Sequence, residues 1–381
     1  MMSSVMALTP ALQRFDWGST DAIPQLLGFA PDGQTYAEAW WGAHPVAPST
    51  TDQGPLDAVI AADPTAMLGS RCEREYGELP FLLKVLAIEH PLSIQVHPTL
   101  DRARQGYAAE QAAGMRLDNP HRIYKDASHK PEMLLALTEL TVLSGFRPAA
   151  DVAADLLLLG GDDASRLADV ITAGGIHAYV DAVLTEPHHQ AVERITQASG
   201  DLSASTRVAR DALAIHPSDP GALVALAMNA VTLQPGETLF TPSGVVHCYV
   251  GGVGVEVMAN SDNVVRAGFT HKAVNADLLR DLAFLEPTAP VATHTEQVGA
   301  AQVVTVDAAE FQLTVVEDGQ ATIDEGPRIV VALRGDCTVA TETDTQRLGA
   351  GQAVFIAASD GQAHLDVSGL AVIASVPGGA H

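Results

Sequence analysis

The amino-acid sequence predicts a mainly β protein, with two β-barrels and an inserted α-helical domain. Apolar, β-branched runs broken by proline and glycine occur towards both ends of the chain, which is typical of strands and tight turns. A central stretch, residues 148–227, is instead rich in Ala, Leu and Asp at helical spacing. Segments 233–244 and 348–359 place their glycine and apolar residues alike. This weak internal similarity indicates two related barrels rather than a repeat array.

The first strand-rich part covers residues 1–147. Its clearest strands lie in the apolar run 79–98, which is divided by Pro80 and Pro91. Proline cannot donate to a strand ladder, so these positions mark strand ends. Residues 101–119 break this pattern, and we expect them to form a helix.

Changes in composition divide the rest of the chain. The helical insert, residues 148–227, interrupts the strand pattern, which returns over residues 228–290 as the second part of the same barrel domain. Residues 291–381 then form a C-terminal barrel of short strands at regular spacing. Segment 286–301 is expected to act as a linker.

Charge and composition exclude several classes of partner. The formal net charge of −25 argues against nucleic acid, which requires clustered Lys and Arg. It does not exclude an anionic substrate, since surface charges are screened beyond about 8–10 Å in physiological salt. Three widely spaced cysteines fit reduced thiols and a cytoplasmic location. The N-terminus shows no leader pattern, and no apolar run approaches roughly 18 residues, so we expect no membrane span.

Two short motifs in the first part carry polar side chains at alternate positions. Ser93, Gln95 and His97 alternate with two apolar residues, so in a strand they share one face. They would point into a wet barrel interior, and the alternative is a solvent-facing strand edge. Lys130 and Glu132 are also two apart, at the start of an apolar run. The alternative for this pair is a solvated Lys and Glu beside a turn.

The segment 236–247 is similar to the second motif of the cupin superfamily, Gly-x5-Pro-x-Gly-x2-His. Its glycines and proline shape a strand–turn–strand that would point His247 into a cupin (jelly-roll) barrel. A satisfied core histidine is the alternative for His247 alone, but not for a pattern of this length. At the equivalent positions of the C-terminal domain, 357, 359 and 362 are Ala, Ser and Gln. We therefore expect that domain to be a degenerate cupin without metal.

A fourth polar segment, 256–268, follows in the chain. It contains Glu256 and Arg266, and Lys272 comes shortly after it. The alternative is a polar loop in which Asp262 and Arg266 form an ion pair.

Gln95, His97, Glu132 and His247 together would supply two imidazole nitrogens and two oxygens. Such a donor set suits Zn²⁺, with Mn²⁺, Co²⁺ or Fe²⁺ as alternatives. A neutral Gln leaves the ion more positive than a second carboxylate would, and hence a stronger Lewis acid.

Taken in order, these segments resemble the type I mannose-6-phosphate isomerase family. The family's motifs look like QxHP, HKPEM, PGE…G…HxY and SDNxxRxG, and here they fall at residues 95–98, 129–133, 235–249 and 261–268. The resemblance implies a metal-dependent aldose–ketose isomerase that interconverts mannose 6-phosphate and fructose 6-phosphate through an enediol(ate). We expect one zinc ion per chain, a small sugar phosphate as partner, and a monomer.

The resemblance also implies roles for individual residues. The expected metal ligands are Gln95, His97, Glu132 and His247. The expected catalytic residues are Arg266, Glu256 and Lys130, with His129 as a third candidate for the proton-shuttling base. The expected substrate contacts are Ser93, Lys84, Tyr249 and Lys272.

Two other classes of protein remain as alternatives. One is an Fe-dependent cupin dioxygenase, although such sites are usually His-rich triads with open positions for oxygen. The other is a non-catalytic sugar-binding or storage bicupin, which would not need a charged pocket. Anaerobic activity would discriminate against the first, and binding of mannose 6-phosphate without turnover would favour the second.

Overall fold

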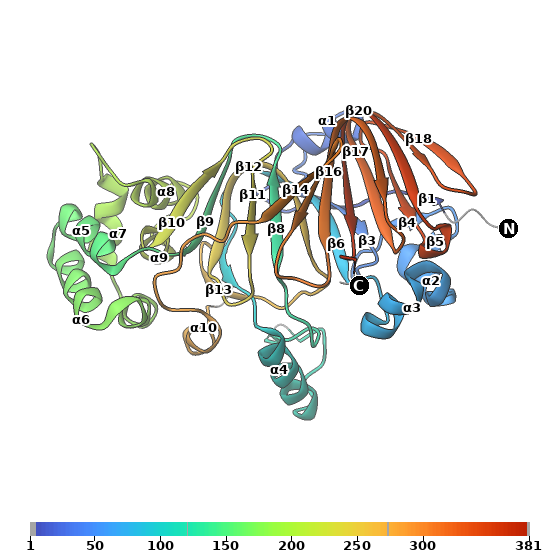
Figure 1. Ribbon diagram of the computed structural model, residues 1–381. Coiled ribbons are helices and arrows are strands. Elements are labelled where there is room, and N and C mark those ends of the chain that lie inside the picture. The colour runs from blue at the N-terminus through green and yellow to red at the C-terminus, as the bar shows by residue number, and fades with distance from the viewer. Residues whose placement is uncertain (1–4, 120, 273, 379–381) are drawn as a thin grey trace.

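The computed structural model describes residues 5–119, 121–272 and 274–378. Strand residues exceed helical residues, 35% against 29%, so the mainly β prediction is confirmed. Figure 1 shows the strands gathered into two neighbouring sheets, with a group of helices at one end and smaller helices at the other. The division of the strands into two closed barrels, and the domain boundaries at 147, 227 and 290, stay predictions.

The larger sheet has ten strands, all in antiparallel pairs, and is built from both sides of the helical insert. Its centre is β12, which pairs with β6, β7, β8 and β9. Its strands are β2 (Ala11–Gln13), β3 (Glu38–Gly42), β6 (Phe81–Ile88), β7 (Ile94–Val96), β8 (Glu132–Ala136), β9 (Leu140–Phe146), β10 (Met228–Leu233), β11 (Thr238–Thr241), β12 (His247–Ala259) and β13 (Val265–Gly268).

The second sheet has eight strands and comes from the C-terminal part of the chain, joined by the N-terminal strand. Its strands are β1 (Val5–Leu8), β14 (His294–Val298), β15 (Ala301–Thr305), β16 (Gln312–Ile323), β17 (Arg328–Ala340), β18 (Thr345–Gly349), β19 (Ala353–Ile356) and β20 (Ala363–Ser375). The short strands β4 (Thr50–Thr51) and β5 (Gly54–Pro55) pair separately. The expectation of a linker over 286–301 is wrong for residues 294–298, which form β14. This strand pairs with β15 across a two-residue loop that begins at Gly299.

Five helices lie within residues 148–227, at the left end of the molecule in Figure 1. They are α5 (Ala149–Leu159), α6 (Asp162–Thr185), α7 (His189–Gln197), α8 (Ala204–Ala212) and α9 (Gly221–Leu226). Among the described residues, α6 alone is long and apolar enough to pass for a membrane span. Its residues Leu167, Ile171 and Tyr179 are buried in the core that these helices share, as in a core helix.

The remaining helices are short and border the sheets. They are α1 (Ala22–Leu27), α2 (Leu56–Ala62), α3 (Pro64–Tyr76), α4 (Leu100–Ala112), α10 (Ala276–Leu282) and a 3-10 turn (Ala358–Asp360). The helix expected over 101–119 is shorter than predicted. It ends at Ala112, because the chain turns away at Gly114, which has a left-handed φ of 69° that favours glycine.

One apolar core connects the two sheets. Leu83 of β6 and Met133 of β8 belong to the same buried cluster as Phe311, Leu313 and Phe355 of the C-terminal part. The C-terminal sheet therefore packs directly behind β6 and β8.

Candidate metal centre

Strand pairing brings the predicted site residues together. His247, the first residue of β12, lies opposite Gln95 of β7, and Arg266 of β13 lies opposite the same Gln95. Glu132 opens β8 and lies opposite Met258, near the other end of β12. The Glu132 side chain also reaches His247, at the opposite end of β12, so β12 must bend strongly between these two contacts. A register shift between Tyr249 and Gly251 lies in the bent part.

Three buried side chains converge at this bend. The Nε2 atoms of His97 and His247 lie 3.1 Å from Oε1 and 3.1 Å from Oε2 of Glu132, respectively. One potential ligand atom of each of His97, Glu132 and His247 lies within 4.8 Å of the other two. All three side chains are about 1% exposed. A carboxylate thus lies between two imidazoles in a dry environment.

The hydrogen bonds of Nδ1 in both histidine rings determine that Nε2 is the nitrogen available to bind a metal ion. Nδ1 of His97 lies 2.6 Å from the main-chain oxygen of Asn263, and Nδ1 of His247 lies 3.0 Å from that of Val245. A carbonyl oxygen only accepts, so each Nδ1 carries a proton, and in the neutral form of a ring the lone pair is then on Nε2. Burial, with a smaller effect of Lys130, lowers the pKa of His97 to about 4, so that ring is neutral near pH 7.

These lone pairs point at the Glu132 carboxylate, which is also electron-rich. Nε2 of His97 is buried and makes no hydrogen bond within the described ranges. Such an orphaned nitrogen facing a carboxylate is unfavourable unless a cation lies between them. Two imidazoles oriented by carbonyl groups, together with one carboxylate, are a donor set that fits a divalent metal ion.

Gln95 completes the cluster. Its amide Nε2 lies 3.4 Å from Nε2 of His247, and its Oε1 lies 3.5 Å from the hydroxyl of Ser93. A half-turn of the amide exchanges oxygen and nitrogen, and would direct the oxygen towards the other donors. Ile94 and Val96, the alternating apolar residues, are fully buried on the other face of the strand.

Cationic and hydroxyl groups hold Glu132 in its ionised form. Nζ of Lys130 lies 2.8 Å from Oε1, and the hydroxyl of Tyr249 donates to Oε2 at 3.2 Å. Burial raises the pKa of Glu132, but its neighbours, Lys130 first, outweigh burial and hold that pKa well below its usual range. Burial, followed by the charges of Glu132 and Glu256, raises the pKa of Tyr249. Tyr249 therefore contacts the cluster as a neutral donor.

A second buried ion pair lies beside the first. Nζ of Lys84 is 3.0 Å from Oε2 of Glu256, its register partner across β6 and β12, and 5.0 Å from the ring of Trp40. Burial lowers the pKa of Lys84, but the carboxylates of Glu256, Glu38 and Glu132 raise it more, so Lys84 stays charged. Burial raises the pKa of Glu256 despite Lys84.

Two further cations come from β13 and from the segment that follows it. Arg266 is partly buried, and burial lowers the pKa of its guanidinium. The charge of Arg266, followed by burial, lowers the pKa of Lys272, so the two side chains lie near each other. Within the described ranges, neither side chain forms an ion pair with a carboxylate. This pair offers positive charge to an anionic group.

The ion pair considered between Asp262 and Arg266 is wrong. Oδ1 of Asp262 instead lies 3.4 Å from Nε2 of the buried His44. Burial raises the pKa of Asp262, but His44 lowers it more, so Asp262 is a carboxylate facing the same region. His44 belongs to none of the sequence motifs, so no local pattern marks it as part of the site.

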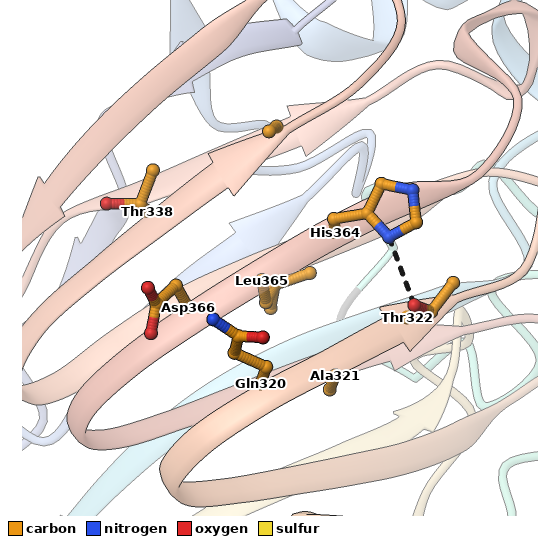
Figure 2. A pocket seen from close by; sticks show the side chains of 8 residues that line it. Gln320, Ala321, Thr322, Thr338, His364, Leu365 and Asp366 are labelled. Atoms are coloured by element: carbon orange, nitrogen blue, oxygen red, sulfur yellow. Dashed lines mark hydrogen bonds between the residues drawn. The ribbon is translucent and has the colours of Figure 1, made fainter.

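Two surface hollows lie away from this cluster. One of 340 Å³ lies on the C-terminal sheet, where Thr322, Asp366 and His364 line it (Figure 2), and a hydrogen bond of 3.0 Å joins His364 to Thr322. The other, of 410 Å³, lies at residues 116–118. Neither contains converging buried donors, so the donor chemistry and not the size of a hollow locates the site.

The strands and the buried donor set define a cupin-type metalloprotein with lysine and carboxylate side chains beside the metal centre. Residues 5–149 match the family described as phosphomannose isomerase type I, catalytic domain. Mannose-6-phosphate isomerase of Escherichia coli is 33% identical over 93% of this chain and 95% of its own, and the human enzyme is 32% identical over 74% of each. The chain belongs to the type I phosphomannose isomerase family.

Solved structures support the same assignment. The Salmonella typhimurium mannose 6-phosphate isomerase bound to fructose 6-phosphate and zinc superposes with a TM-score of 0.91 at 30% identity. The match covers 98% of this chain and 100% of that one. A zinc-bound form of the isomerase gives a TM-score of 0.90. These relatives leave the dioxygenase and storage alternatives without support.

Proposed function

We propose that this protein interconverts mannose 6-phosphate and fructose 6-phosphate, using one zinc ion per chain. The observation that carries the proposal is the convergence of two imidazole lone pairs on the Glu132 carboxylate, beside lysine and arginine side chains. His97, Glu132, His247 and Gln95 would hold the ion. Bound zinc supplies Lewis acidity, which stabilises negative charge on substrate oxygens by several kcal/mol, as an order of magnitude.

The reaction moves a proton between C1 and C2 of the open-chain sugar, so a base must face both carbons. Glu256 and Lys130 are our candidates, with His129 as the third. The raised pKa of Glu256 suits a group that takes up and returns a proton, and Lys84 stabilises its anionic form at 3.0 Å. Nζ of Lys130 lies 2.8 Å from Oε1 of Glu132, and from there it would also donate to a developing oxyanion.

The substrate's phosphate needs positive charge that no carboxylate already neutralises. Lys84 is paired with Glu256 and is only 5% exposed, so its charge serves the interior of the site. Arg266 and Lys272 are better suited, because they lie near each other. Arg266 either binds the phosphate or steadies the enediolate oxygen, and Ser93 and Tyr249 position sugar hydroxyls.

The wider setting follows from the same reasoning. We propose a cytoplasmic monomer that acts on a small sugar phosphate and binds neither nucleic acid nor a membrane. The negative overall charge and the free, buried cysteines are consistent with this. We also propose that residues 1–147 and 228–290 form the catalytic cupin domain, with 148–227 inserted and 291–381 appended.

A coupled assay with mannose 6-phosphate, in the presence and absence of a chelator, tests the function. Turnover should disappear on chelation and return with zinc, and elemental analysis should give one zinc per chain. Full turnover by metal-free protein would refute the role of the metal, and absence of turnover by zinc-loaded protein would refute the activity.

A further inference from the structure

A hydrogen bond joins the C-terminal part of the chain to the motif beside the metal centre. Nε2 of His129 lies 2.7 Å from Oε1 of Glu310, and the two side chains are only 21% and 13% exposed. His129 directly precedes Lys130, which contacts Glu132. Glu310 comes from the loop before β16, in the part of the chain that the sequence analysis expected to be structural.

The main chain beside Glu310 is anchored in the apolar core. The next residue, Phe311, is fully buried in the core that joins the two sheets. Burial raises the pKa of Glu310, but the neighbouring His129 is the first of the groups that lower it more. The carboxylate is therefore ionised, and the adjacent Phe311 anchors its main chain.

This arrangement is not explained by stability alone. Oε2 of Glu310 is buried and has no hydrogen-bond partner in the described part of the chain. A half-satisfied buried carboxylate is costly, so a role outside folding is expected of it. A carboxylate oxygen only accepts, so Nε2 of His129 must carry a proton. In the neutral ring, Nδ1 then has the lone pair.

We propose that Glu310 is a positioning residue for the isomerisation, which fixes the ring and tautomer of His129 and thereby the orientation of the segment that carries Lys130 and Glu132. The inference rests on the proposed function. It gives the C-terminal domain a direct part in the reaction, because this domain supplies the side chain that orients a motif of the catalytic domain.

Turnover by matched variants tests this role. Glu310→Gln keeps the shape of the side chain and removes its charge, and Glu317→Gln makes the same change at an exposed ion pair with Arg334. We expect Glu310→Gln to lower kcat by about ten- to a hundred-fold, with little change in KM or zinc content. Glu317→Gln should match the wild type. Equal kcat values for the two variants would overturn the proposal.

A double-mutant cycle separates positioning from a structural effect. If Glu310 acts through His129, Glu310→Gln should cause no further loss of kcat in a His129→Gln background. Losses that multiply would refute the proposal.

The tautomer of His129 gives a readout without activity. A long-range ¹H–¹⁵N spectrum of histidine-labelled protein, with His129 assigned from His129→Gln, should show the Nε2–H form in the wild type. It should show a loss of this preference in Glu310→Ala. Identical ¹⁵N shifts in both would overturn the proposal. If the wild type failed to turn over mannose 6-phosphate, the proposed function would fall, and this spectrum would still decide the role of Glu310.

Discussion

Nδ1 of His97 lies 2.6 Å from the main-chain oxygen of Asn263, so a loop residue orients a proposed metal ligand. The side chain of Asn263 is fully buried and ties this loop to the segment before Lys130. Its Oδ1 accepts from the N–H of Lys125 at 2.7 Å, and its Nδ2 donates to the carbonyl of Ser128 at 2.8 Å. One amide thus supports both the ligand His97 and the neighbouring motif.

Asn263→Ala should weaken zinc binding. The loop would lose its side-chain anchor and would hold the carbonyl opposite His97 less firmly, so we expect about a ten- to a hundred-fold rise in the Kd for zinc. Competition with a fluorescent chelator measures this constant. Asn275→Ala is the control, because Asn275 caps α10 by accepting from Leu278, and its loss should cost about 1 kcal/mol without affecting zinc. An unchanged Kd in Asn263→Ala would contradict the assignment.

Lys84→Met should destabilise the protein strongly. It leaves Glu256 buried and uncompensated, which costs about 3–5 kcal/mol in the free energy of unfolding, measured by urea denaturation. Combining it with Glu256→Leu should restore much of this stability but not turnover, because the polar pair is lost from the site. Arg334→Met, at an exposed pair, should cost less than about 1 kcal/mol. A double variant as unstable as Lys84→Met would argue against the buried pair.

Arg266→Ala should reduce turnover while leaving the zinc content intact. Arg266 lies opposite Gln95 in the strand register, but its guanidinium is not among the metal donors. We expect kcat/KM to fall by about 10²–10³-fold, as for the loss of one charged stabiliser, with partial recovery in Arg266→Lys. The coupled assay and elemental analysis give the two readouts. Turnover within a few-fold of the wild type would remove Arg266 from the catalytic residues.

The sequence predicts some parts of the site and not others, for physical reasons. The alternation of Ser93, Gln95 and His97 and the two-residue spacing of Lys130 and Glu132 are local properties of extended chain, so both were predictable. Contacts such as His129 with Glu310 join residues 181 positions apart and depend on how the two sheets pack. No local pattern marks them, and only the resemblance to a family joined the separate motifs into one site.

The strand at 294–298 and the early end of α4 show a second limit of prediction from the sequence. β14 has no apolar alternation, because all five of its residues are exposed at the sheet edge. Its pairing with β15 alone makes it a strand. The end of α4 depends on the single left-handed residue Gly114, in a segment whose composition otherwise favours a helix.

The three cysteines should be unreactive in the folded protein. Burial raises the pKa of Cys72 to about 12, and burial with the charge of Asp366 raises that of Cys337 to about 11. Cys248 is fully buried, its pKa is raised by burial, and its Sγ donates to the carbonyl of Leu92 at 3.1 Å.

At pH 8, a thiol with a pKa near 12 is thiolate in only about one molecule in 10⁴, and the thiolate is the reactive form. We therefore expect a disulfide reagent such as DTNB to titrate no thiols in the native protein and all three in guanidinium. Zinc removal should not change the native result, because the proposed ligands are imidazole, carboxylate and amide groups. A thiol that became reactive on chelation would indicate a cysteine ligand, and would contradict the donor set of the metal centre.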